Sequence, residues 1–111
     1  MKQITAIIQP HMLAKVEHAL RELPHFPGFT LLRAKGHGRA TAHADGKAEL
    51  AFDEHDKLLL LMFCSDAIAP QIVETIRENA HTGLPGDGLI ALSEAIELVR
   101  IRTGERGDDA V

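Results

Sequence analysis

Two glycine-rich segments are candidates for binding an anion. The first is KGHGR over 35–39, and the second is TGLPGDG over 82–88. Glycines let backbone N–H groups converge on anionic oxygens, because no Cβ atom stands in the way. Each segment taken alone is equally well explained as a turn or a bulge. They indicate a phosphate site only if the fold brings cationic groups to them.

Three arginines could supply those cationic groups. Arg39 ends the first segment, and Arg100 and Arg102 lie two residues apart near the end of the sequence. Residues two apart in an extended chain project to the same face, and a guanidinium can bind phosphate through two parallel hydrogen bonds. Asp87 could accept hydrogen bonds from a ribose or a base edge. These residue types could bind a phosphate-bearing ligand, but arginines on an edge strand are more often solvated than ligand-bound.

Composition limits the possible classes of function. The chain has 111 residues, which suits one domain, and a formal net charge of −4. A nucleic-acid partner is not expected, because phosphate-backbone binding needs an excess of Lys and Arg. The single cysteine, Cys64, excludes an internal disulfide and fits a reducing compartment. No signal peptide and no bilayer-length apolar run are visible, so we expect a cytoplasmic protein without membrane insertion.

Hydrophobic periodicity predicts the order strand, helix, strand, strand, helix, strand. Strands are predicted over 3–8, 29–35 and 57–64. Extended segments are predicted over 89–92 and 95–102, either separate or as one strand interrupted near 93–94. One helix is predicted up to Pro24, and another over 68–80 with Asp66 as its N-cap. Apolar periodicity is lost over 36–56, which predicts a long loop of a kind that is usually functional or disordered.

The order βαββαβ predicts a ferredoxin-like α+β sandwich, in which two helices cover one face of an antiparallel sheet. The stretch LLLLMFC over 58–64 is continuously apolar instead of alternating. The sheet face away from the helices must therefore be apolar as well. Three subunits that pack their sheets together would cover it, so we expect a homotrimer.

Four segments, in the right order, resemble the PII family of nitrogen-regulatory signal-transduction proteins. They are MKQITAIIQP over 1–10, KGHGR over 35–39, the glycine-rich run over 82–88 and RIRTGE over 100–105. The resemblance implies one domain, 1–111, with a T-loop over 36–56, a B-loop over 81–88, and a C-loop and tail over 100–111. It also implies a trimeric regulator, not an enzyme, that binds ATP or ADP between subunits. Through its T-loop such a protein would control a partner, here a membrane transporter or efflux component.

The same resemblance implies which residues bind the nucleotide. Its adenine side would be lined by Gly28, Phe29, Thr30 and Phe63. Its ribose and phosphates would be surrounded by Gly36, His37, Gly38, Arg39, Gly86, Asp87, Gly88, Arg100 and Arg102. Ile7 and Lys57, the latter at the far base of the T-loop, complete the predicted nucleotide-binding set. No residue is expected to be catalytic.

Three departures from the family pattern change what the protein is expected to sense. Ala40 stands where the family has a glutamine that holds the magnesium bridging ATP to 2-oxoglutarate, and alanine offers no oxygen to a cation. The chain has no tyrosine, which excludes control by nucleotidylation of a T-loop tyrosine. Leu84 and Leu89 replace B-loop lysines, so ADP or AMP should compete with ATP better than in ordinary members. Participation of magnesium is left open.

Two other classes of function stay open. The predicted T-loop contains His43, Asp45 and His55, whose imidazoles and carboxylate suit a transition metal such as zinc or copper. A PII-like branch associated with heavy-metal efflux is similar, so a metal-tolerance trimer is one alternative. These residues lack a tight metal-binding spacing, however, and a polar, solvated loop is the more usual explanation for them. A small enzyme on a ferredoxin-like fold is the other alternative, but no catalytic triad or Cys/His pair is evident.

Overall fold

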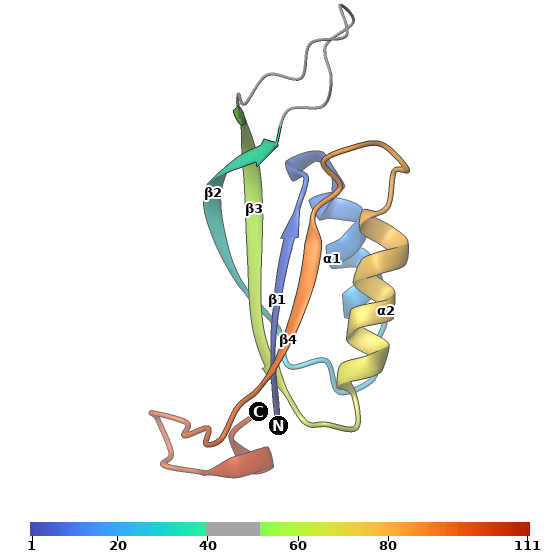
Figure 1. Cartoon of the computed structure of the whole chain (residues 1–111). Helices are drawn as coiled ribbons and strands as arrows, with labels where there is room; N and C mark the ends of the chain where they lie inside the picture. The colour runs from blue at the N-terminus through green and yellow to red at the C-terminus, as the bar shows by residue number, and fades with distance from the viewer. Residues whose placement is uncertain (40–51) are drawn as a thin grey trace, which may run out of the picture.

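The computed structural model describes residues 1–39 and 52–111 (Figure 1). Its strands and helices occur in the order βαββαβ, which confirms the prediction. The elements are β1 (Lys2–Ile8), the 3-10 turn η1 (Pro10–Met12), α1 (Leu13–Arg21), β2 (Thr30–Arg39), β3 (Phe52–Cys64), α2 (Ala69–Ala80), β4 (Leu89–Glu94) and the 3-10 turn η2 (Gly107–Ala110).

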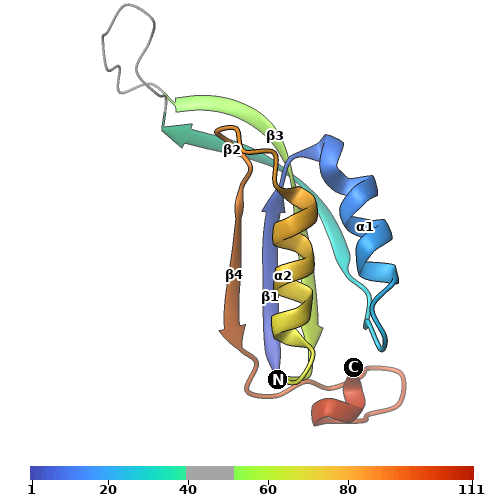
Figure 2. The ribbon, with the colours of Figure 1, turned by 90° about the vertical axis from the view of Figure 1, so that its right-hand side faces the viewer.

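The four strands form one antiparallel sheet in the order β2-β3-β1-β4. In the β1–β3 register Ile4 faces Met62, and in the β2–β3 register Thr30 faces Leu61. Both helices lie on the same face of this sheet, as the side view in Figure 2 shows. The arrangement is the predicted ferredoxin-like α+β sandwich.

The core lies between the sheet and the two helices. Side chains alternate along a strand, so every second residue of β1 and β3 points toward the helices. Aliphatic side chains carry the packing, and the Cys64 thiol is buried among them, where burial raises its pKa. The largest fully buried side chains of this core are Ile4, Ile8, Val16, Leu20, Leu60, Met62, Cys64, Ile72 and Ile76.

The opposite face of the sheet is apolar and incompletely covered. Leu59 and Leu61 of β3 and Ile7 of β1 point to this side, and each stays only half-buried. At the flanks, Leu32 of β2 is 49% exposed and Leu89 of β4 is 59% exposed. A single chain therefore leaves the predicted subunit-packing surface open to solvent.

The prediction of a loop over 36–56 was wrong at both ends of that range. Pairing between β2 and β3 continues from Gly36 opposite His55 to Arg39 opposite Phe52. The hairpin extends past the helices (Figure 1), so its outer part has no core to face. Strand pairing there rests on backbone hydrogen bonds, which need no apolar alternation. Hydrophobic periodicity consequently missed it.

Three smaller predictions were also wrong. α1 ends at Arg21, three residues before Pro24. The N-cap of α2 is Ile68, without a side-chain cap, while the Asp66 carboxylate accepts a hydrogen bond from the amino group of Met1 at 2.8 Å. Instead of a continuous extended segment over 95–102, the structure shows an isolated bridge between Val99 and Arg106.

Candidate functional site

The predicted nucleotide-binding residues form two groups at opposite ends of the sheet. One lies where the β2–β3 hairpin meets the loop that precedes β4. It is here called the hairpin-end group and comprises Ile7, Gly36, His37, Gly38, Arg39, Lys57, Gly86, Asp87 and Gly88. The other lies beside the loop before β2 and the C-terminal segment (Figure 1). It is here called the tail-end group and comprises Gly28, Phe29, Thr30, Phe63, Arg100 and Arg102. β2 connects the two: Thr30 to Gly36 is six residues of strand, or about 20 Å at ~3.3 Å per residue. One chain therefore cannot close both groups around one nucleotide.

At the hairpin end, the 82–88 loop folds around the carboxylate of Asp87. Oδ2 of Asp87 accepts hydrogen bonds from the backbone N–H groups of Thr82 at 2.8 Å and Gly83 at 2.9 Å. Oδ1 accepts the Thr82 hydroxyl and, at 3.4 Å, the Gln9 side-chain amide. These bonds, the Thr82 hydroxyl above all, lower the pKa of Asp87 from 3.8 to about 2. Asp87 thus holds the loop in shape.

This pKa shift gives a pH-dependent prediction. Because the folded pKa lies below the unfolded value, Asp87 should stabilise the fold above pH 3.8 and lose that contribution as the pH falls toward about 2. We expect Thr82→Ala to raise the pKa of Asp87 toward 3.8, as measured by NMR titration of its carboxyl carbon. Thr103→Ala, at the other end of the sheet, is the matched control. An Asp87 that titrates at 3.8 in the unsubstituted protein would contradict the assignment.

Two glycines of the hairpin-end group stand at close approaches, one to a backbone atom and one to a side chain. At Gly88, where φ is +102°, a Cβ atom would lie 1.8 Å from the carbonyl oxygen of Ile7. At Gly36, a Cβ atom would lie 2.9 Å from Cγ of Lys57. The Lys57 ammonium donates a hydrogen bond to the carbonyl oxygen of Gly86 at 2.6 Å. The structure therefore places 36, 57 and 86–88, which are distant in sequence, beside one another.

At the tail end, five predicted residues line one cavity of about 400 Å³. They are Gly28, Phe29, Thr30, Phe63 and Arg100. Ala110 and Val111, in and just after the 3-10 turn η2, also line it. The sequence reading missed this contribution, because the polar tail carries no periodic apolar signal. An apolar cavity with a few placed polar groups is the usual form of a small-molecule site.

Within this cavity, Arg100 carries an unsatisfied donor. Its Nε atom is buried and has no hydrogen-bond partner in the part of the chain that the structure describes. A buried donor without a partner costs about 1–3 kcal/mol. Because Arg100 also lines the cavity, the residues there suit a ligand that combines an apolar body with negative charge.

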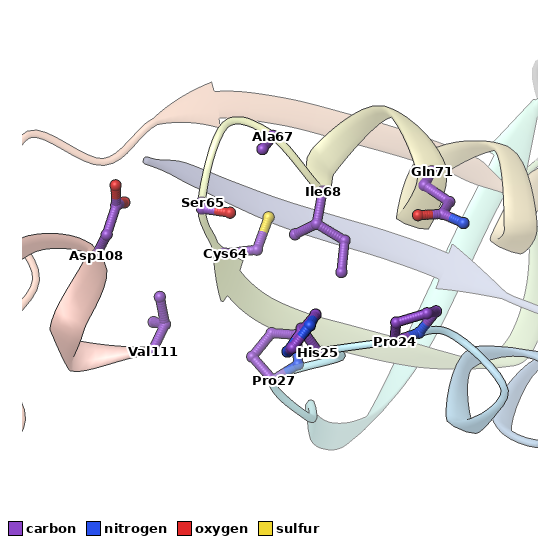
Figure 3. A pocket seen from close by; sticks show the side chains of 10 residues that line it. All are labelled: Pro24, His25, Pro27, Cys64, Ser65, Ala67, Ile68, Gln71, Asp108 and Val111. Atoms are coloured by element: carbon purple, nitrogen blue, oxygen red, sulfur yellow. The ribbon is translucent and has the colours of Figure 1, made fainter.

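A second cavity, of about 470 Å³, adjoins the first on the helix side of the sheet (Figure 3). Pro27 and Val111 line both cavities and so separate them. The second contains Cys64 and also His25, a non-glycine residue with φ at +59°. None of the predicted nucleotide-binding residues lines this second cavity.

The other predicted residues make fewer contacts that would fix their position in a site. Gly38 and Arg39 belong to the paired part of β2, opposite Asp53 and Phe52. His37 and Arg102 are exposed, and Arg102 is not among the residues that line the tail-end cavity.

The proposed metal ligands are only partly visible. His43 and Asp45, like Ala40, lie outside the described residues, and His55 is exposed on β3. Within 1–39 and 52–111, no three His, Cys, Asp or Glu side chains are grouped so that they could hold a metal ion. No helix in those ranges has the length and apolar character needed to cross a membrane.

Comparison with known proteins gives consistent matches over the whole chain. The family model described as "Nitrogen regulatory protein P-II" matches residues 1–105. Nitrogen regulatory protein P-II of Azospirillum brasilense is 41% identical over 113 residues, and that of Rhizobium meliloti is 42% identical, each covering 100% of both chains. Nitrogen regulatory protein P-II 1 of Escherichia coli is 38% identical with the same coverage.

A solved structure is also similar. The B. subtilis GlnK-ATP complex superposes with a TM-score of 0.84, covering 99% of this chain and 96% of that one at 24% sequence identity. At this level of identity the likeness supports the fold, which agrees with the strand order observed here.

Proposed function

The chain belongs to the nitrogen regulatory protein P-II family, and on that premise we propose that it is a trimeric sensor of adenine nucleotides. ATP or ADP would bind in clefts between subunits, each formed by the hairpin-end group of one subunit and the tail-end group of another. The occupied state would act on a partner through the 36–56 segment, with a membrane transporter or efflux component as the partner class. The protein would work in the cytoplasm as a regulator, without a catalytic step of its own.

One observation carries this proposal: the two groups of site residues lie at opposite ends of the same sheet. They can surround one ligand only if two copies of the chain meet. The apolar sheet face that a single chain leaves open, with Leu32 and Leu89 at its flanks, offers the surface for that meeting. Burial of apolar area there would stabilise the assembly by about 25 cal/mol per Å².

The chemistry of the two groups suits the two parts of a nucleotide. The tail-end cavity is lined by two aromatic side chains, Phe29 and Phe63, and by Arg100. The hairpin end brings the glycine-rich loop against the Lys57 ammonium, which contacts the carbonyl oxygen of Gly86. Adenine would occupy the first group, and the phosphates would bind between the second group and the arginines of the tail-end group. Each residue role in this assignment is part of the proposal.

The departures from the family pattern define what such a sensor would not do. With Ala40 in place of the glutamine, it would not couple ATP to 2-oxoglutarate through magnesium in the usual way. Without any tyrosine, it would not be switched by nucleotidylation of a T-loop tyrosine. With leucines at 84 and 89, it would discriminate less between ATP and ADP than a site that has lysines there.

The experiment is isothermal titration with ATP and ADP, each with and without Mg²⁺ and 2-oxoglutarate, on protein whose mass is measured by sedimentation. We expect a trimer that binds nucleotide at micromolar concentration, with an affinity that 2-oxoglutarate does not change. Leu59→Glu should break the trimer and abolish binding together, because a charge would be buried on the packed sheet face. Glu74→Gln, on the outer helix α2, is the control. A monomer that still binds nucleotide would overturn the two-subunit site.

A further inference from the structure

We propose that Lys57 is a positioning residue, which fixes the 82–88 loop against the base of the β2–β3 hairpin before any ligand arrives. This inference rests on the proposed nucleotide site, since it concerns how the hairpin-end group is held ready. The role lies in the side chain's contact with another loop and is separate from any direct contact with a nucleotide.

The geometry joins three segments through one side chain. Lys57 belongs to β3. Its ammonium donates a hydrogen bond to the carbonyl oxygen of Gly86 at 2.6 Å, although the two residues are 29 positions apart in sequence. The same ammonium nitrogen lies 3.5 Å from the position that a Cβ atom of Gly86 would occupy. Gln9, which follows β1, approaches the loop from another side through its 3.4 Å contact with Asp87. The loop is thus held to the sheet by two polar side chains.

Gly36 makes room for this contact. The stem of Lys57 runs across the backbone of β2, so that a Cβ atom at position 36 would lie 2.9 Å from Cγ and 3.4 Å from Cε of Lys57. Cγ is near the root of the side chain and cannot swing aside without moving the ammonium. The glycine therefore has a structural reason apart from phosphate binding: it lets the lysine lie flat and reach Gly86.

A charged hydrogen bond across the two segments would reduce the freedom of the loop. Hydrogen bonds that involve a charged group are stronger than those between neutral groups, and the gain is smaller where solvent reaches the bond. Holding Gly86 and Gly88 in place in advance spares a ligand the entropy of ordering them. The predicted consequence is that the loop is ordered in the ligand-free protein and that its order depends on position 57.

Hydrogen–deuterium exchange of the ligand-free full-length protein tests this directly. Lys57→Met keeps the stem and removes the ammonium, whereas Gly36→Ala keeps the ammonium and displaces the stem. In both variants we expect the amide hydrogens of 82–88 to exchange about 5- to 10-fold faster than in the unsubstituted protein. An increase of this size corresponds to the weakening of one hydrogen bond. Lys15→Met, on the exposed side of α1, should leave that exchange unchanged.

The outcomes separate the possible roles. Slow exchange of the β1 amides shows in every variant that the fold is intact. If Lys57→Met weakens ADP binding but leaves exchange of 82–88 unchanged in the ligand-free protein, then Lys57 contacts the ligand only and the positioning role is wrong. An effect of Lys57→Met without any effect of Gly36→Ala would likewise overturn the role given to Gly36. If the unsubstituted protein binds no nucleotide, the proposed function fails while this measurement still decides the inference.

Discussion

Gly88→Ala is expected to lower the free energy of unfolding by at least about 3 kcal/mol, a cost that only a few kinds of substitution reach. The new Cβ atom would lie 1.8 Å from the Ile7 carbonyl oxygen, and that atom belongs to the central strand β1. The φ of +102° adds strain that an L side chain rarely accepts. The strand cannot shift to relieve this contact without breaking hydrogen bonds, because Ile7 pairs with both β3 and β4.

The measurement is chemical denaturation at a fixed protein concentration, since an assembly unfolds at a concentration-dependent midpoint. Gly104→Ala is the matched control: its φ is +75°, but no atom lies within 4 Å of the added Cβ. It should cost only the backbone strain, about 1–2 kcal/mol. Equal losses in the two variants would show that the contact with Ile7 relaxes and that backbone strain accounts for the whole effect.

Arg100→Met is expected to weaken ADP binding about 10- to 150-fold, the equivalent of the 1.5–3 kcal/mol that a charge-assisted hydrogen bond contributes. Methionine keeps an apolar stem in the tail-end cavity and removes the guanidinium. In the ligand-free protein the Nε atom has no partner within 1–39 and 52–111, so its removal should leave the free energy of unfolding unchanged or raise it.

The two readouts are isothermal titration with ADP and denaturation without ligand, made on the same preparation. Arg77→Met on α2, whose guanidinium pairs with Glu74, is the control and should leave ADP affinity unchanged. An unaltered affinity in Arg100→Met would remove this residue from the site. A large decrease in the free energy of unfolding would show that the Arg100 side chain stabilises the fold and is not reserved for a ligand.

Much of the fold could be predicted from the sequence because its core elements have clear periodicity. Val16 and Leu20 at helical spacing, and the apolar run over 58–64, correctly indicated a helix and a central strand. Prediction failed where structure does not depend on apolar side chains. The outer hairpin, from Gly36 opposite His55 onward, is held by backbone pairing, and so its strands look like a loop in a hydrophobicity pattern.

The site shows the same division. The glycine runs and the arginines indicated candidate segments, because their residue types limit the chemistry. Their three-dimensional grouping could not be predicted from spacing: the sequence gives no hint that Gly36 clears a path for Lys57, or that Val111 lines the cavity with Phe63. Such contacts join residues that are far apart along the chain. They depend on the sheet register, which single-residue patterns do not contain.

The proposed cleft, which joins the hairpin-end group of one subunit to the tail-end group of another, would also have a genetic consequence. Consider one allele damaged only at the hairpin end and another damaged only at the tail end. Homotrimers of either would contain no intact cleft. In a mixed ring of three, however, one junction brings together the undamaged half of each product. Two defective alleles expressed in the same cell should therefore complement each other in part, whereas two alleles damaged at the same end should not.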